Sequence, residues 1–278
     1  MATTLATALH SKGYSIVAVS SRSRRSADRL AKNIESCRSC SSQEVANSAE
    51  LVFITTPDDA IAAVASEVKW RPEQSVIHCS GADSTAILSP ARKTGASVGV
   101  FHPLQTFTGS RQEKLTGITY AIEADKPLLM ILKEMATTLG GRWIELKVED
   151  KVLYHTAAVF ACNYLVTLLK IATDLWQHLG IPPKQATHAL LPLLQGTINN
   201  IETAGIPQCL TGPIARGDNG TIKKHLKALQ EAAPELVTIY QELGLKTIPI
   251  ALAKGKIDKE QANKLQVVLN RTGEGTVR

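Results

Sequence analysis

The stretch ATTLATALHSKGYSIVAVSSRS, residues 2–23, decides how the first half of the chain is interpreted. Its pattern predicts a helix from Ala2 to His10, a turn at Gly13, an apolar strand over 15–20 and then a basic loop. In chains that bind dinucleotides, this order of helix, turn and strand follows a first strand and a G-x-G-x-x-G loop. The stretch therefore predicts the later part of a nucleotide-binding βαβ unit.

The first strand and the glycine loop of such a unit do not occur in this sequence. We expect that the start at Met1 is too late by a strand and a loop, roughly 12–20 residues. The alternative is that Met1 is the genuine start and that the domain is decayed or repurposed. Because the first strand is central in the usual strand order, its absence leaves two unpaired strand edges within the sheet.

Short apolar segments alternate with helical patterns through residues 1–148. After the segment at 15–20, strands are expected at 51–55, 75–80, 97–101 and 118–123, with a further candidate at 142–149. Helical patterns cover 26–35, 58–68, 84–94 and 126–139. Continuous apolar strands that alternate with helices are typical of a parallel sheet covered on both faces.

The pattern changes near residue 150, where strand signals nearly disappear. Residues 153–180 predict one long helix that is apolar on nearly every face, and such a helix is expected to be buried between domains or subunits. Further helices are expected at 184–204, 219–231, 233–243 and 258–270. The sequence thus predicts an α/β fold, a Rossmann-type doubly wound parallel sheet that lacks its first strand, over residues 1–148. An all-helical C-terminal domain follows over 149–278.

Composition narrows the class of protein. Hydrophobic residues make up 44% of the 278 residues and charged residues 20%, as in an ordinary globular protein. No run of 18 apolar residues predicts a membrane span, and five irregularly spaced cysteines favour a reducing, cytoplasmic location. The net charge of +6 comes from scattered lysines and arginines, so we expect no nucleic-acid partner. The Cys37-x-x-Cys40 pair has no second pair of ligands nearby, and no metal is expected.

The loop after the segment at 15–20 indicates which cofactor would bind. A site for NAD places an acidic residue here, whereas this loop presents hydroxyl and guanidinium groups, which suit the 2′-phosphate of NADP. The alternative is a solvated loop before a helix capped by Ser23 or Ser26. The cofactor-binding candidates in the loop are Ser20, Ser21, Arg22 and Arg25.

Other candidate cofactor ligands follow the next two strands. Thr55, Thr56 and Pro57 come after the segment at 51–55, and Ser80 and Gly81 end the segment at 75–80. Ligands of open α/β sheets lie at the carboxyl ends of strands, and we expect Thr56 to face the nicotinamide side. The alternative for the first group is a plain strand-to-helix turn.

Several longer motifs together resemble a known family. They are ALHSKGYSIVAVSSRSRRSADRLA (8–31), LVFITTPDDAIAAVA (51–65), VIHCSGADS (76–84), GVFHPLQTF (99–107), YHTAAVFACNYLV (154–166) and LTGPIARGD (210–218). The chain resembles bacterial Rossmann-like proteins with a DUF2520 C-terminal domain. That family is allied to the 6-phosphogluconate dehydrogenase-like reductases, which include ketopantoate reductase and pyrroline-5-carboxylate reductase. The resemblance implies an NADP-binding domain, a helical domain that often forms homodimers, and a reacting carbon near the loop at Ser80.

Four residues are candidates for the chemistry. His102 follows a strand and can donate a proton to a substrate carbonyl or pair with a carboxylate; alternatively it only bonds backbone in a turn. His155 and Asn163 are polar residues on the long apolar helix, and a core role is the alternative for both. Related reductases place a lysine four residues before this asparagine, where this chain has Val159. Arg216 can clamp a substrate carboxylate.

The sequence therefore favours an NADP-dependent oxidoreductase that transfers a hydride to or from a small carbonyl or imine substrate, for example a 2-oxo acid, in the interdomain cleft. His102 or His155 would donate the proton, Asn163 would orient the substrate and Arg216 would bind its carboxylate. The partners expected are a small-molecule substrate and a second copy of the chain, with neither nucleic acid nor membrane. The alternative function is a non-catalytic nucleotide-binding or dimeric interaction protein.

Overall fold

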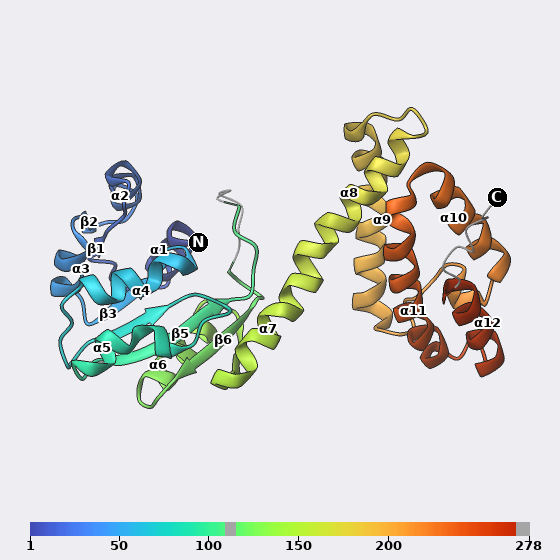
Figure 1. Cartoon of the computed structure of the whole chain (residues 1–278). Helices are drawn as coiled ribbons and strands as arrows, with labels where there is room; N and C mark the ends of the chain where they lie inside the picture. The colour runs from blue at the N-terminus through green and yellow to red at the C-terminus, as the bar shows by residue number, and fades with distance from the viewer. Residues whose placement is uncertain (109–114, 271–278) are drawn as a thin grey trace. The chain divides into compact units, whose positions relative to one another are not determined.

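The computed structural model describes residues 1–108 and 115–270. Its packing divides the chain into two compact units, Met1–Tyr164 and Leu165–Arg278 (Figure 1). The division falls inside a long helical segment, while the domain boundary expected at 148/149 stays a prediction.

The first unit is built on strands that form two sheets. The smaller sheet pairs β1 (Ala18–Val19) with β2 (Arg38–Ser39) in parallel. The larger sheet has the order β3-β4-β5-β6-β7, with bounds Leu51–Ile54, Ser75–His78, Ser97–Pro103, Thr119–Ala124 and Arg142–Glu145. All neighbours in it are parallel except β5 and β6. The expected α/β class with a parallel-dominated sheet is confirmed.

Four details differ from the sequence-based expectation. The strand expected over 15–20 is only two residues long, and β2 was not expected at all. β6 runs antiparallel to β5 because a parallel neighbour needs a crossover, usually a helix, and the described residues between these strands form none. The helix expected over 84–94 is split into a 3₁₀ turn and the short helix α5 (Ser89–Lys93).

The break between the two sheets has a clear position. In the described part of the chain no strand pairs with both β1 and β3, so each keeps one edge without a strand partner. In a dinucleotide-binding sheet this central place belongs to the strand that precedes the glycine loop. The break therefore falls where the sequence predicts the absent first strand.

Helices cover both faces of the larger sheet (Figure 1). On one face, α1 (Ala2–Ser11) and α6 (Leu128–Thr138) pack against Ile77, Phe101 and Tyr120. On the other, α3 (Ser42–Ser48), α4 (Asp58–Glu67) and α5 pack against residues such as Val76. Successive strand residues thus point into different cores, as expected for a sheet buried on both sides. The short helix α2 (Arg24–Ala31) follows β1.

The segment that joins the units is helical throughout. It runs through α7 (Lys151–Ala158), a π-helical turn (Val159–Asn163) and α8 (Tyr164–Gln177). The second unit continues with α9 (Pro183–Ala204), α10 (Asn219–Ala232), α11 (Val237–Lys254) and α12 (Lys259–Asn270). Its core lies among α10, α11 and α12, around Ile222, Ile248 and Leu265.

The expected burial of the long helix between domains or subunits stays a prediction. In the single chain Leu153 is 74% exposed and Phe160 is 66% exposed. By length and composition alone, one described helix, Val148–Gln177, is apolar enough to cross a membrane, with a mean hydropathy of 1.5. The helices of soluble proteins can pass the same test.

The turn before β7 has room only for glycine, and this generates a stability prediction. A Cβ on Gly141 would lie 2.5 Å from Cε2 of Tyr120 and 2.8 Å from the carbonyl oxygen of Ile118. Since Tyr120 is fully buried, its ring cannot move away. We expect Gly141→Ala to lower the free energy of unfolding by about 2–3 kcal/mol, measured by urea denaturation.

The matched control is Gly220→Ala in the first turn of α10, where the added methyl group meets only the Asp218 carboxylate at 3.5 Å. This variant is expected to be neutral or slightly stabilising. Equal stability of the two variants would contradict the packing described here.

Candidate active site

The carboxyl ends of β3, β4 and β5 bring five of the predicted residues to one edge of the sheet. Thr55 and Thr56 follow β3, Ser80 and Gly81 follow β4 after one intervening residue, and His102 is near the end of β5. The three strands are parallel and in direct succession, so these ends lie side by side. This is the edge at which open α/β sheets bind ligands.

Ser80 organises the loop after β4. Its hydroxyl accepts from the backbone N–H groups of Ala82 and Asp83, and lies 2.9 Å from an oxygen of Asp58 and 3.0 Å from one of Asp83. A hydroxyl has one hydrogen, so Ser80 donates to one of the two carboxylates at a time. The side chain is committed to shaping this loop, and its role as a cofactor ligand stays a prediction.

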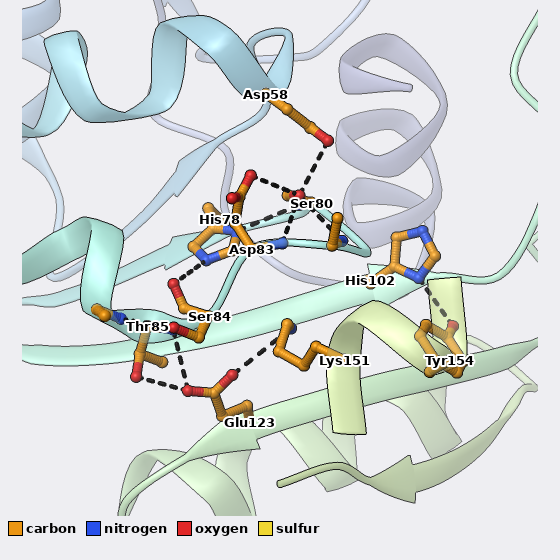
Figure 2. A network of polar contacts seen from close by, with 12 residues as sticks. Asp58, His78, Ser80, Asp83, Ser84, Thr85, His102, Glu123, Lys151 and Tyr154 are labelled. Carbon is orange, nitrogen blue, oxygen red and sulfur yellow. Dashed lines mark hydrogen bonds and ion pairs between the residues drawn. The ribbon is translucent and has the colours of Figure 1, made fainter. Parts of the chain in front are cut away.

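His78, to which the sequence assigned no role, supports the same loop from the end of β4. Its Nδ1 accepts from the N–H of Ser80 at 3.1 Å, and its Nε2 donates to the carbonyl oxygen of Ser84 at 3.1 Å. The ring is fully buried, and this burial lowers its pKa, with a further contribution from the Lys151 charge. His78 is therefore a neutral imidazole with its hydrogen on Nε2 (Figure 2).

Gly81 allows two imidazoles to approach the loop. A Cβ at this position would lie 2.9 Å from Nε2 of His102 and 3.0 Å from Nδ1 of His155. The centroids of the two rings are 6.5 Å apart. Nδ1 of His155 is buried and has no hydrogen-bond partner among the described residues. The structure thus brings together His102 and His155, both candidates from the sequence. Nδ1 of His155 is left to bond a ligand.

His102 has an electrostatically unusual environment. Its Nδ1 lies 2.8 Å from the hydroxyl of Tyr154. Burial lowers the pKa of His102 to about 4, and the Lys151 charge and the neighbouring His155 and His78 add to this effect. His102 is therefore uncharged at neutral pH, and any proton that it donates comes from the neutral ring.

A buried ion pair lies beside these histidines, and sequence analysis missed it. Lys151 is only 1% exposed, and its Nζ lies 3.5 Å from Oε2 of Glu123 on β6. The other oxygen, Oε1, accepts from the N–H of Thr85 at 3.0 Å and from its hydroxyl at 2.6 Å (Figure 2). Burial lowers the pKa of Lys151, while Glu123 opposes this shift.

The signal that could have found Lys151 is a lysine at the start of an apolar helix, three residues before Tyr154. The family resemblance implies a lysine only at position 159, four residues before Asn163. A lysine is therefore present in the site region, on the same helical segment but two turns earlier.

Two other predicted residues belong to elements that carry no residue of this cluster. Asn163 is exposed at the end of the π-helical turn, which adds a residue to the turn and shifts the register assumed for a uniform α-helix. Arg216 belongs to the second unit, where it is exposed on a 3₁₀ turn (Ile214–Arg216). Asp218 caps α10 by accepting from the N–H of Thr221 at 3.0 Å. The catalytic roles of Asn163 and Arg216 stay predictions.

Two groups of residues fit the two ends of the NADP that the resemblance implies. For the 2′-phosphate end, the exposed residues after β1 are Ser20, Ser21, Arg22 and Arg25, and Ser23 makes no side-chain cap to α2. For the nicotinamide end, Oγ1 of Thr56 is buried without a hydrogen-bond partner in the described part of the chain. Pro57 precedes α4 as its N-cap residue. These groups fit the 2′-phosphate and the nicotinamide end, while the sequence contains no glycine loop for the pyrophosphate.

No metal centre competes with this interpretation among residues 1–108 and 115–270. Within those ranges, no group of three or more His, Cys, Asp or Glu side chains is placed to hold a metal ion.

Two family models together match most of the chain. A Rossmann-like domain model matches residues 1–103, and the model of a domain of unknown function, DUF2520, matches residues 118–247. The chain thus carries a match to each of the two domains that the resemblance implies. The order of the two matches along the chain is the order that the sequence predicted. No curated protein matches the sequence.

Solved structures resemble this protein along most of its length. A protein from Bacteroides fragilis described, by inference, as an NADP oxidoreductase shares 28% identity and a TM-score of 0.71, covering 92% of this chain and 94% of that one. A Thermotoga maritima protein shares 26% identity and a TM-score of 0.73, covering 92% and 98%. A reductive aminase from Aspergillus terreus, solved with NADPH, shares the fold at 14% identity and a TM-score of 0.63, covering 96% and 95%.

The neutral state of His102 predicts how stability depends on acidity. The pKa of His102 is about 4 in the folded protein and near 6.5 in the unfolded chain. Between pH 6.5 and pH 4, His102 binds a proton in the unfolded chain but stays neutral in the folded protein. The free energy of unfolding therefore falls as the pH drops from 6.5 to 4. His102→Gln should remove up to about 3 kcal/mol of this loss, measured by urea denaturation across the range.

The matched control is His178→Gln, which replaces an exposed histidine of the second unit. His78 is retained in wild type and in both variants, and it contributes the same pH dependence of the free energy of unfolding to each. If His102→Gln and wild type lose stability in parallel, the low pKa of His102 is wrong.

Proposed function

We propose that this protein is an NADP-dependent oxidoreductase that transfers a hydride to or from a small carbonyl or imine compound. The observation that carries the proposal is the convergence of His102 and His155 on Gly81, at the carboxyl edge of a Rossmann-type sheet. Two uncommitted imidazole nitrogens at a ligand-binding edge are hydrogen-bonding groups for a reacting oxygen or nitrogen. The Bacteroides fragilis relative, described by inference as an NADP oxidoreductase, supports the same class.

The chain's own groups would hold the cofactor at its two ends. Arg22 and Arg25, with Ser20 and Ser21, bind the 2′-phosphate, because guanidinium groups pair with phosphate oxygens. The Thr56 hydroxyl bonds the nicotinamide end, and Thr55, Pro57, Ser80 and Gly81 form the adjoining walls. When bound, the nicotinamide supplies or accepts the hydride.

The remaining candidates act on the substrate. His102 and His155 face the reacting oxygen or nitrogen, and Asn163 orients the substrate from the helical segment. Arg216 binds a substrate carboxylate, which favours 2-oxo acids or the imines derived from them. The competing function, nucleotide binding without turnover, predicts that substitutions at His102 and Arg216 change no reaction rate.

We also propose that the protein forms a homodimer in the cytoplasm. Within the second unit, α8 and α9 expose large apolar side chains that soluble proteins normally cover. They include Val166, Leu168, Leu191, Leu193 and Ile198. A second copy would bury these faces, and the apolar character of the long helix would then reflect burial in the assembly.

The cofactor proposal predicts a preference for NADPH over NADH. In fluorescence or calorimetric titrations, the purified protein should bind NADPH, and R22A/R25A should weaken that binding about 10- to 100-fold with little effect on NADH. Arg29→Ala is the matched control, because Arg29 is exposed on α2, as Arg25 is, and has no assigned role. Absence of NADPH binding would contradict the proposal. Turnover with small 2-oxo acids and cyclic imines then separates an enzyme from a binding protein.

The dimer proposal predicts a mass of two chains by light scattering. V166E/L193E places charges on the exposed apolar faces of α8 and α9, and it should yield a monomer. Val267→Glu on α12 is the control, since it also charges an exposed apolar residue of the second unit, and it should leave the dimer intact. A wild-type monomer, or binding of the wild type to lipid vesicles, would contradict the proposal.

A further inference from the structure

Tyr154 lies beside His102 in a geometry that the sequence did not predict. It belongs to α7 and directly precedes His155. Its hydroxyl is 2.8 Å from Nδ1 of His102, and the two rings meet edge to face at 5.7 Å and 89°. Burial raises the pKa of Tyr154 to about 12, so the hydroxyl keeps its hydrogen at neutral pH. Both partners of this hydrogen bond are therefore uncharged.

The direction of the bond follows from what each group needs. A phenol hydrogen requires an acceptor, and the unprotonated nitrogen of a neutral imidazole supplies one. If Tyr154 donates to Nδ1, the single ring hydrogen of His102 must sit on Nε2. Nε2 is the atom that lies against Gly81, next to the buried Nδ1 of His155. The hydrogen is then presented to the ligand edge of the sheet.

The groups around His102 also keep it from becoming a cation. From α7, Lys151 and His155 oppose a positive charge on the ring, and from β4 His78 acts in the same direction. Glu123 on β6, the one acid in the ion pair with Lys151, accepts from Thr85 through its other oxygen. Figure 2 shows Lys151 between Glu123 and the two histidines His78 and His102.

We propose that Tyr154 is a positioning residue that holds His102 as a neutral imidazole with its hydrogen on Nε2, and that this N–H is the donor to the substrate's carbonyl oxygen or imine nitrogen. The second half of this statement rests on the proposed function. A neutral donor suits the reaction because negative charge develops on that atom when hydride reaches the carbon. A neutral imidazole acting as an electrophile is an established catalytic arrangement in other enzymes.

The protons balance across the pair. When the substrate atom takes the hydrogen from Nε2, the Tyr154 hydrogen moves to Nδ1, so the imidazole stays neutral. Before the next turnover Nε2 takes a proton from solvent and Nδ1 returns its hydrogen to the tyrosinate, which restores the starting tautomer. In the oxidation direction, the same steps run in reverse.

The direct test is the tautomer of His102, read by NMR of the full-length protein with ¹⁵N-labelled histidine. The His102 signals are assigned by their loss in His102→Gln. In wild type they should show hydrogen on Nε2 and none on Nδ1, from pH 8 down to about pH 5.5, because the pKa of His102 is about 4. Hydrogen on Nδ1, or a cationic ring in this range, overturns the proposal without the need for any variant.

Tyr154→Phe then tests the positioning role, since it removes only the hydroxyl. The His102 ring should become a mixture of tautomers, while the urea midpoint shows that the protein stays folded. The chain offers a matched control in the second unit, where the Tyr240 hydroxyl lies 2.8 Å from Nδ1 of the exposed His225. Tyr240→Phe should leave His102 unchanged. A single unchanged tautomer of His102 in Tyr154→Phe would refute the role of Tyr154.

Activity provides the final comparison. With a substrate turned over by wild type, Tyr154→Phe should lower kcat at least about tenfold and leave the Kd for NADPH unchanged. If wild type binds no NADPH, the proposed function fails while the tautomer result still stands. If wild type turns over and Tyr154→Phe retains full kcat, the positioning role fails while the proposed function stands.

Discussion

A buried ammonium group has to be paired with an anion, and this constraint organises the centre of the first unit. Lys151 at the start of α7 meets Glu123 on β6, and the carboxylate is held in turn by Thr85. The pair anchors the first turn of the helix to the sheet, because separating buried charges costs several kcal/mol. Tyr154 and His155 lie one turn further along the helix, so the same anchor positions them against His102.

The ion pair also determines the charge state of its surroundings. Burial and the lysine charge act together on His78 and His102, and both lower the pKa of the imidazoles. His78 uses its neutral ring to bond the loop after β4, whereas His102 directs one nitrogen to Tyr154 and the other to Gly81. Both histidines are thus neutral, but they differ in role: His78 shapes the loop after β4, and His102 lies at the carboxyl edge of the sheet.

The family resemblance implies a lysine four residues before Asn163, where this chain has Val159. Lys151 does not substitute for it directly, since its ammonium lies against Glu123 and the residue is 1% exposed. Its charge instead lowers the pKa of His102. In the function that we propose, the hydrogen-bond donor at the reacting atom is therefore an imidazole.

The sequence by itself determined the α/β class, the order of the two domains and the edge of the sheet that carries Thr56, Gly81 and His102, because strand and helix periodicity and strand ends are local properties. It also led to His155 as a candidate. Only the tertiary structure decided that β6 runs antiparallel, that the long helix is exposed in the single chain, and that Lys151, Glu123 and Tyr154 belong to the site. Those facts depend on pairings between residues that are distant in sequence, such as His102 with Tyr154, and on the burial that such pairings create.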